Sequence, residues 1–188
     1  MVQRILHYDR QLFKLINHGW SNPFFDWLMP WLRNAELWYP LYLFLLLLVL
    51  VNFKKNSWIW VLGAVLTVVL CNLVSSTFIK ENIWRTRPCN VSEYSSWIHI
   101  LVGYRPQSSS FTSSHAANHF GMAMFFYLTL KQKFNKWPAL FFVWAFMISL
   151  AQVYVGVHYP LDVTCGALIG ILIGYLSGKL YNIKYGLA

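Results

Sequence analysis

Long apolar runs constrain this chain more than any other feature of its sequence. Four strong runs occupy residues 37–53, 57–79, 114–130 and 138–157, and a fifth covers residues 160–181. Each is close to the ~20 residues that a helix needs to cross ~30 Å of hydrocarbon at a rise of ~1.5 Å per residue. The runs predict an all-α fold, a polytopic transmembrane helical bundle with at least five spans.

Two weaker segments precede these runs. Residues 4–17 alternate apolar and charged side chains, which predicts an N-terminal amphipathic helix lying in the membrane interface. Residues 22–33 form a short apolar piece, and they raise the expected count from five spans to six if they cross. Residues 1–36 are therefore expected to form an interfacial segment of a single membrane domain that comprises residues 1–188.

The composition excludes several classes of protein. Of the 188 residues, 57% are hydrophobic and only 11% are charged, whereas a soluble domain has about 25% charged residues. The 19% of aromatic residues excludes disorder. The net charge of +9 comes from short basic loops between apolar runs, a pattern that favours contact with anionic lipid headgroups over binding of nucleic acid. The cysteines lack metal-ligand spacing and are expected to be free packing thiols: Cys71, Cys89 and Cys165.

Lysines predict the orientation of the bundle. Under the positive-inside rule the basic loops face the cytoplasm, and they hold Lys54, Lys55, Lys131, Lys133, Lys136, Lys179 and Lys184. Residues 80–113, the longest polar stretch, would then face the other side and are expected to be functional. Four basic residues of the N-terminal segment would share that side, which conflicts with the rule.

A histidine and an aspartate lie four residues apart at the head of the last apolar run. At this spacing on a helix, His158 and Asp162 would share one face. The carboxylate could hold one imidazole nitrogen and leave the other free as a base or nucleophile. Ionisable groups at membrane depth are costly, so the pair points to function. A structural hydrogen bond that ties the turn to the helix is an equally good interpretation of this pair alone.

Basic residues gather where the run 57–79 ends. Lys80, Arg85 and Arg87 lie within eight residues of one another, and they would form an anion site if the chain folds back on itself, because guanidinium groups grip phosphate oxygens with two donors. Taken alone, snorkelling to lipid headgroups explains these bases better.

A third group consists of hydroxyl side chains. They occupy residues 108–114, apart from Phe111, and His115 follows them. Such residues commonly cap a helix, but a helix N-terminus with hydroxyls and free N–H groups also binds phosphate. His115 in the first helical turn is placed to act as a general acid. The predicted topology puts all three groups at one membrane face, and this convergence indicates a functional site.

At these residues the chain resembles the type 2 phosphatidic acid phosphatase (PAP2) superfamily of lipid phosphate phosphatases, whose signatures read K-x6-RP, PSGH and SR-x5-H-x3-D. Lys80, Arg87 and Pro88 match the first signature completely. Residues 112–115, Thr-Ser-Ser-His, match the second at its Ser and His. Residues 151–162 keep the His and Asp of the third. The catalytic motifs thus cover residues 80–162 in the family's order.

The resemblance implies a role for each matched residue. His158 would attack phosphorus to form a phosphohistidine while Asp162 holds its ring, and His115 would protonate the leaving oxygen. It implies no metal and no other cofactor. The phosphoryl oxygens would be bound by Lys80, Arg87, Ser113 and the backbone N–H of Ser114.

One position departs from the family pattern. Gln152 stands where the family has an arginine of the phosphate clamp, and a neutral donor makes a bond about half as strong as a charged one. We expect Arg85 or Arg105 to supply the missing charge, which adds Arg85 and Gln152 to the expected phosphate-binding residues. The alternative is a non-catalytic protein that binds a lipid phosphate without hydrolysing it.

The sequence therefore predicts a metal-independent phosphatase for lipid phosphates or diphosphates in a bacterial inner (cytoplasmic) membrane, with its site facing the periplasm or exterior. Undecaprenyl diphosphate is the first expected substrate, because the chain is short and the outer loop compact; lipid A phosphates and phosphatidylglycerol phosphate follow. The expected partners are this substrate and membrane lipids, and the oligomeric state is open. A small transporter that uses His158 and Asp162 as a proton relay would leave Lys80, Arg87 and Ser113 unexplained.

Overall fold

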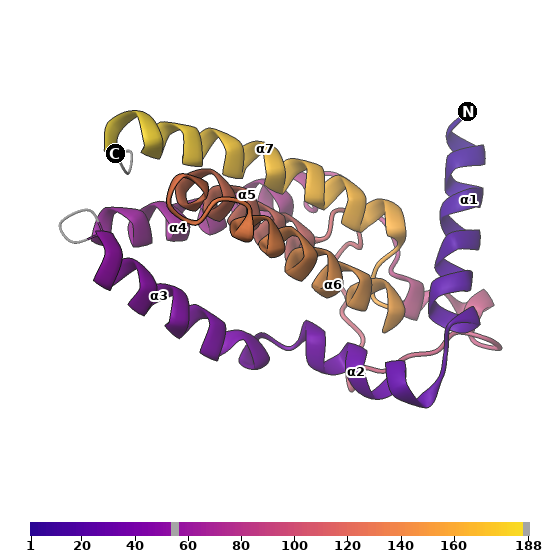
Figure 1. The fold of residues 1–188 in the computed structure, drawn as a ribbon. Helices are drawn as coiled ribbons and strands as arrows, with labels where there is room; N and C mark the ends of the chain where they lie inside the picture. The colour runs from indigo at the N-terminus through magenta and orange to yellow at the C-terminus, as the bar shows by residue number, and fades with distance from the viewer. Residues whose placement is uncertain (54–56, 186–188) are drawn as a thin grey trace.

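The computed structural model describes residues 1–53 and 57–185, and within these ranges every regular element is helical, so the all-α prediction is confirmed (Figure 1). A π-helical segment, Leu73–Ile79, continues the helix Ser57–Asn72 to Lys80. The helices are α1 (Val2–Lys14), α2 (Pro23–Arg33), α3 (Tyr39–Phe53), α4 (Ser57–Asn72), α5 (Ser114–Phe134), α6 (Leu140–Tyr154) and α7 (Pro160–Tyr185).

Four of the described helical segments are long and apolar enough to cross a membrane: Ala35–Asn52, Ser57–Ile79, Trp137–Tyr154 and Pro160–Tyr185. The protein is therefore an integral membrane protein, and its many exposed apolar side chains on α3, α4, α6 and α7 suit contact with lipid. The expected fifth span corresponds to α5, which packs against α4, α6 and α7 but is more polar than the other four. The sixth span was expected at residues 22–33, where α2 has 11 residues and reaches about 17 Å. The count of five to six spans stays a prediction.

Glycines bring α5 and α7 unusually close together. Gly166, Gly170 and Gly174 are buried on one side of α7 and face α5. A Cβ atom at Gly170 would overlap the backbone carbonyl of Ala117, so only glycine permits this approach. The contact brings the first turn of α7 against the start of α5, where the backbone N–H of Ser113 donates to the carbonyl oxygen of Asp162 at 3.0 Å. Close helix packing thus joins two of the three predicted motifs.

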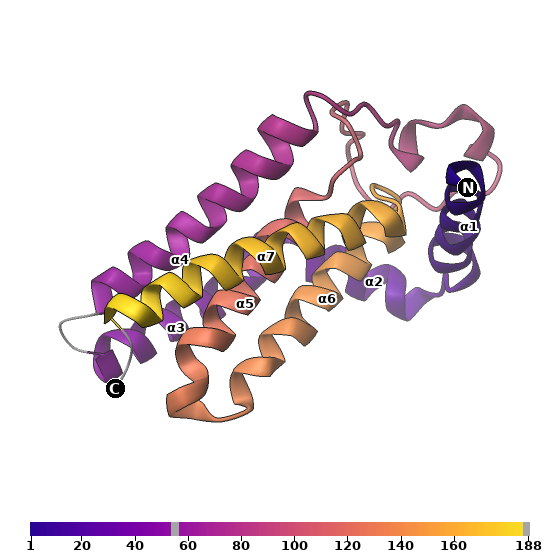
Figure 2. The ribbon, with the colours of Figure 1, turned by 90° about the horizontal axis from the view of Figure 1, so that it is seen from above.

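The ends of the bundle differ in character. The end of α4, the start of α5, the end of α6 and the start of α7 lie together beside residues 80–113 (Figures 1 and 2). The α5–α6 turn and the end of α7 lie at the opposite end, and with them lie Lys131, Lys136 and Lys184. Lys54 and Lys55 fall outside the described residues. The predicted separation of basic turns from the polar loop is present, and the side of the membrane that each end faces stays a prediction.

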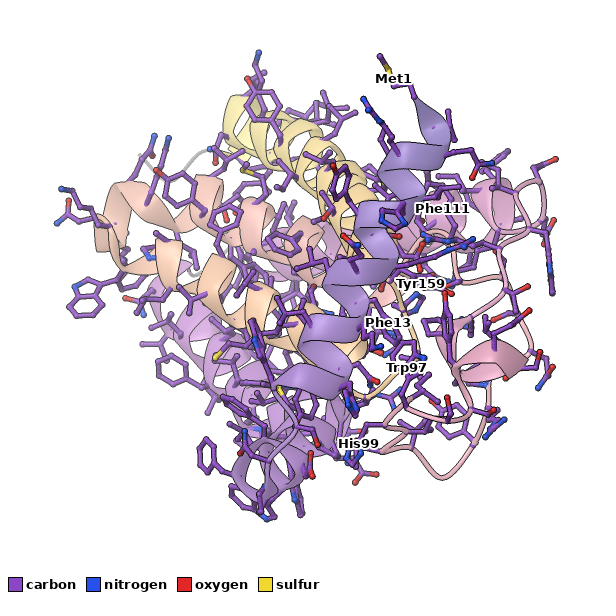
Figure 3. The ribbon with its side chains drawn as sticks, turned by 90° about the vertical axis from the view of Figure 1, so that its right-hand side faces the viewer. Met1, Phe13, Trp97, His99, Phe111 and Tyr159 are labelled. Atoms are coloured by element: carbon purple, nitrogen blue, oxygen red, sulfur yellow. The ribbon has the colours of Figure 1, made fainter. Side chains whose placement is uncertain are left out.

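Helix α1 covers the loop end of the bundle. In Figure 3 it runs across this end, with Phe13 and Tyr159 next to each other behind it. Phe13 is fully buried, and its ring lies 5.3 Å from that of Tyr159 and 6.0 Å from that of Trp97. Asn17 in the turn after α1 bonds the backbone of His99 and the carbonyl of Tyr154. Residues 2–14 are thus helical and packed on the protein, and their place in the membrane interface stays a prediction.

Candidate active site

A tight turn after α6 places His158. The carbonyl of Gln152 accepts the N–H groups of both Val157 and His158, at 3.2 and 3.3 Å. Gly156, which lies between Gln152 and Val157 in this turn, has a φ of +88°. A Cβ atom at this position would also crowd the carbonyl of His99. The turn ends immediately before α7, so His158 lies beside the start of that helix.

His158 and Asp162 form a buried pair. Both side chains are almost completely buried, and Nδ1 of His158 lies 3.6 Å from Oδ2 of Asp162, too long for a good hydrogen bond. The other ring nitrogen, Nε2, lies 3.1 Å from Nη1 of Arg87. Burial lowers the pKa of His158 to about 4, against the opposing effect of Asp162. The imidazole is therefore neutral near pH 7, with one nitrogen toward a carboxylate and the other toward a cation.

Three donors hold the carboxylate of Asp162. Ser110 Oγ and the backbone N–H of Tyr159 both donate to Oδ2, the latter at 2.9 Å. Nη1 of Arg85 donates to Oδ1 at 2.5 Å. A buried carboxylate with this many donors stays ionised and keeps one orientation, so it can orient the neighbouring imidazole.

The structure places Arg85 differently from our expectation. Its guanidinium joins Asp162 and Asp9 of α1, each at 2.5 Å, and lies 4.0 Å above the ring of Tyr159. Burial opposes its charge, but the two carboxylates outweigh this and raise its pKa. Asp9 also accepts the backbone N–H of Leu161 at 2.7 Å. Arg85 therefore lies behind Asp162, where its charge is compensated by two acids, rather than beside Arg87 as a second phosphate donor.

Arg87 and Lys80 provide the positive charge in front of His158. Arg87 is buried, and its guanidinium is fixed by bonds to Ser108 and to the carbonyls of Ser109 and Val157. Burial lowers the pKa of Arg87. Burial also lowers the pKa of Lys80 to about 8, and repulsion by Arg87 adds to this effect. The two cations of the first motif thus lie close together in a site that can bind an anion.

The second motif lies at the start of α5. Ser113 is fully buried, and its Oγ caps the helix by accepting the N–H of Ala116 at 3.3 Å. Ser114 Oγ bonds Ser76 Oγ of the π-helical segment at 2.7 Å, which leaves the backbone of Ser114 as the part available to a ligand. The side chain of His115 is exposed and lines a cavity of about 400 Å³ together with Tyr104. These positions agree with the expected roles and do not test them.

The side-chain amide of Gln152 makes no hydrogen bond to Arg87 or His158. Its side chain is 1% exposed, and its Nε2 atom has no hydrogen-bond partner within the described residues. Arg105, the other expected source of charge, is exposed in the loop. The structure therefore brings together Lys80, Arg87 and His158 and leaves the amide of Gln152 outside this set of contacts.

Two side chains that contact the site were not predicted. Asp9 completes the ion pair of Arg85, and Ser110 binds Asp162. Asp9 could have been noticed as one of only six acids in the chain, whereas nothing distinguishes Ser110 from the neighbouring serines.

This arrangement suits phosphoryl chemistry. The neutral imidazole lies 3.1 Å from the guanidinium of Arg87, and the charge of Lys80 also acts on it, so an anionic phosphate can be bound and its phosphorus approached by Nε2. Within residues 1–53 and 57–185, no three His, Cys, Asp or Glu side chains group in a way that could hold a metal ion. Fold and site define a helical membrane protein with a buried histidine and aspartate beside a buried arginine.

Comparison with known proteins identifies the family. The pattern of the PAP2 superfamily matches residues 57–184, and the chain belongs to this superfamily. A lipid A 4′-phosphatase of Bacteroides thetaiotaomicron is 32% identical over 179 residues, which cover 94% of this chain and 78% of that protein. An undecaprenyl-diphosphatase of Sulfolobus acidocaldarius is 30% identical over 92% of this chain and 78% of its own length. The crystal structure of LpxE from Aquifex aeolicus has 30% identity and a TM-score of 0.62, with 90% of this chain and 93% of that chain covered.

The predicted resemblance is thus confirmed. The protein is a membrane phosphatase of the PAP2 superfamily, and two of its relatives are named as a lipid A 4′-phosphatase and an undecaprenyl-diphosphatase. The matched region excludes α1 and α2, so Asp9 and every other residue before Ser57 lie outside the family pattern.

Proposed function

We propose that this protein hydrolyses a lipid phosphate through a phosphohistidine formed on His158, without a metal ion. The observation that carries the proposal is the environment of the imidazole: Nδ1 faces the fixed carboxylate of Asp162, and Nε2 faces the buried guanidinium of Arg87 at 3.1 Å. A substrate phosphate that replaces the direct contact with Arg87 would meet Nε2 in position for attack.

The reaction has two steps. In the first, the lone pair of His158 Nε2 attacks phosphorus, the bond from phosphorus to the lipid oxygen breaks, and that oxygen takes a proton from His115. In the second, water attacks the phosphohistidine and gives its proton to His115, the P–N bond breaks, and inorganic phosphate leaves. Asp162 stabilises the positive charge that His158 carries in the intermediate.

The phosphoryl oxygens would be bound by Arg87, Lys80, Ser113 and the backbone N–H of Ser114, which stabilise the charge that develops at phosphorus. Arg85 has a different proposed role. Because both of its carboxylate partners are buried, we assign it to positioning Asp162. Gln152 is left with a role in shaping the turn through its backbone carbonyl.

Two classes of lipid substrate have support from relatives. One is lipid A, since a relative that matches 94% of this chain is named as its 4′-phosphatase. The other is undecaprenyl diphosphate, the substrate first expected from the sequence, since another relative is named as its diphosphatase. The proposed location is the inner membrane of a bacterium with the site on the outer face, because the lysine-rich turns gather at the opposite end of the bundle.

The test is release of inorganic phosphate by the purified protein in detergent micelles with EDTA present. Undecaprenyl diphosphate, lipid A and phosphatidylglycerol phosphate are compared for wild type and His158→Ala. We expect release from at least one lipid by wild type and none by the variant, with a phosphohistidine trapped by acid-free quenching of labelled substrate. Binding of all three lipids without any phosphate release would instead indicate a non-catalytic binder.

A further inference from the structure

We propose that Arg33 and Tyr104 form a second anion site, on the leaving-group side of His115, that binds the phosphate of a departing lipid monophosphate. This inference rests on the proposed function and narrows its substrate class to lipid diphosphates. Both residues lie outside the three motifs. Arg33 also lies outside the region that matches the family.

The first support is a shared cavity. A space of about 400 Å³ lies between the end of α2 and residues 101–104 of the loop, and it is lined by Arg33, Tyr104 and His115. In the proposed reaction His115 gives its proton to the oxygen that leaves phosphorus. The atoms attached to that oxygen must therefore extend from His115 into the space that Arg33 and Tyr104 line.

The second support is the unbalanced charge of Arg33. Its Nη2 donates to Tyr104 Oη at 3.1 Å, and its guanidinium lies 5.8 Å from the centre of that ring. Its Nε atom is buried with no hydrogen-bond partner, and no carboxylate in the described part of the chain lies within 4.0 Å of it. A guanidinium has five N–H donors, so Arg33 retains both charge and donors for an anion.

Arg33 also acts on the phosphate site itself. Its charge lowers the pKa of Arg87, an effect smaller than that of burial and than the opposing effects of Cys89, Asp162 and Tyr104. The two arginines therefore affect one electrostatic region, with His115 between the cavity and the site. The end of α2 is a favourable place for any cation because of the helix dipole. That preference alone explains neither the unpaired buried Nε nor the cavity shared with His115.

The chemistry of the leaving group decides which lipid fits. When the terminal phosphorus of a diphosphate is attacked, the bridging P–O bond breaks, and the bridging oxygen departs with the electron pair as part of a lipid monophosphate. That anion would lie against Arg33. When a phosphate monoester is attacked, an alcohol or sugar hydroxyl departs instead and brings no second charge to the cavity. Arg33 should therefore assist diphosphates and be indifferent to monoesters.

The experiment compares farnesyl diphosphate with farnesyl monophosphate as substrates of the full-length protein in micelles. For Arg33→Gln we expect kcat/KM for the diphosphate to fall about 10- to 100-fold, which is the scale of a lost bond to a charged group. We expect kcat/KM for the monophosphate to change by no more than about threefold. Arg33→Lys keeps the charge and should recover part of the loss. Arg4→Gln, at an exposed arginine of α1 that has no role in the site, is the control and should change neither value.

Several results would overturn the inference. An equal loss for both substrates would make Arg33 a general part of the phosphate site, and a wild-type preference for the monophosphate would exclude a second anion site. Binding to the His158→Ala protein, measured by calorimetry, separates this inference from the proposed function. Arg33→Gln, added to His158→Ala, could weaken binding of the diphosphate and not of the monophosphate, while the wild type releases no phosphate from either. In that case the second anion site stands and the proposed catalysis fails.

Discussion

Replacing Arg85 by glutamine tests whether this residue positions Asp162 or binds substrate. The change removes the charged partner of both Asp162 and Asp9, which lie 2.5 Å from its guanidinium. Asp162 would keep its bonds to Ser110 and to the Tyr159 N–H, so its carboxylate would be held less firmly. A bond to a charged group contributes about 1.5–3 kcal/mol. If that energy is lost in the transition state, kcat falls about 10- to 150-fold at 1.36 kcal/mol for each tenfold.

The assay is initial-rate kinetics in micelles on the best lipid substrate, together with thermal unfolding. We expect Arg85→Gln to lower kcat with little change in KM, because the guanidinium of Arg85 is occupied by Asp9 and Asp162. It should also destabilise the protein, since two buried carboxylates lose their counter-ion. Adding Asp9→Asn to this variant removes one of those charges, and it should restore part of the thermal stability without restoring kcat. Arg4→Gln, at an exposed arginine of α1, is the control.

The result that would refute this reasoning is a large rise in KM with kcat unchanged. That pattern indicates lost binding of ground state and transition state alike, and it would return Arg85 to the phosphate-binding set that the sequence suggested. A double variant with stability no better than Arg85→Gln alone would show that Asp9 is not its partner in the membrane.

Two further predictions follow from the geometry. The kcat/KM profile should rise as pH increases through about 4, because His158 must be neutral to attack. It should fall at higher pH as the groups that must be protonated, the general acid His115 and Lys80 with its pKa of about 8, lose their protons. Lys80→Arg should shift the upper limb to higher pH, and an unmoved limb would assign it to another group. Gly170→Ala should lower the free energy of unfolding by about 1–3 kcal/mol through overlap with Ala117, while Gly103→Ala, where a Cβ meets no atom within 4 Å, should have no effect in the same denaturation measurement.

Much of the fold followed from hydropathy. The apolar runs predict the helices with only small errors at their ends, because a helix in hydrocarbon must satisfy all its backbone polar groups internally. The run expected at 114–130 became α5, which extends to Phe134, and the run at 138–157 ended at Tyr154 because the chain turns at Gly156 to place His158. The free cysteines were also as expected.

The sequence by itself determined the helical membrane class, the family and the three groups of polar residues at one end of the bundle. Alternating direction of successive helices is enough to bring Lys80, His115 and His158 to the same end. Each of the three motifs that contain these residues is shorter than fifteen residues, so the sequence alone was enough to detect them.

Only the tertiary structure decided what Arg85, Gln152 and Arg33 contact. Arg85 joins Asp9 and Asp162, which are 76 and 77 positions away in sequence. A buried charge takes the nearest opposite charge that packing provides, because leaving it unpaired costs several kcal/mol. No local pattern records that choice: it depends on α1 lying across the start of α7 and on glycines that let α5 and α7 meet.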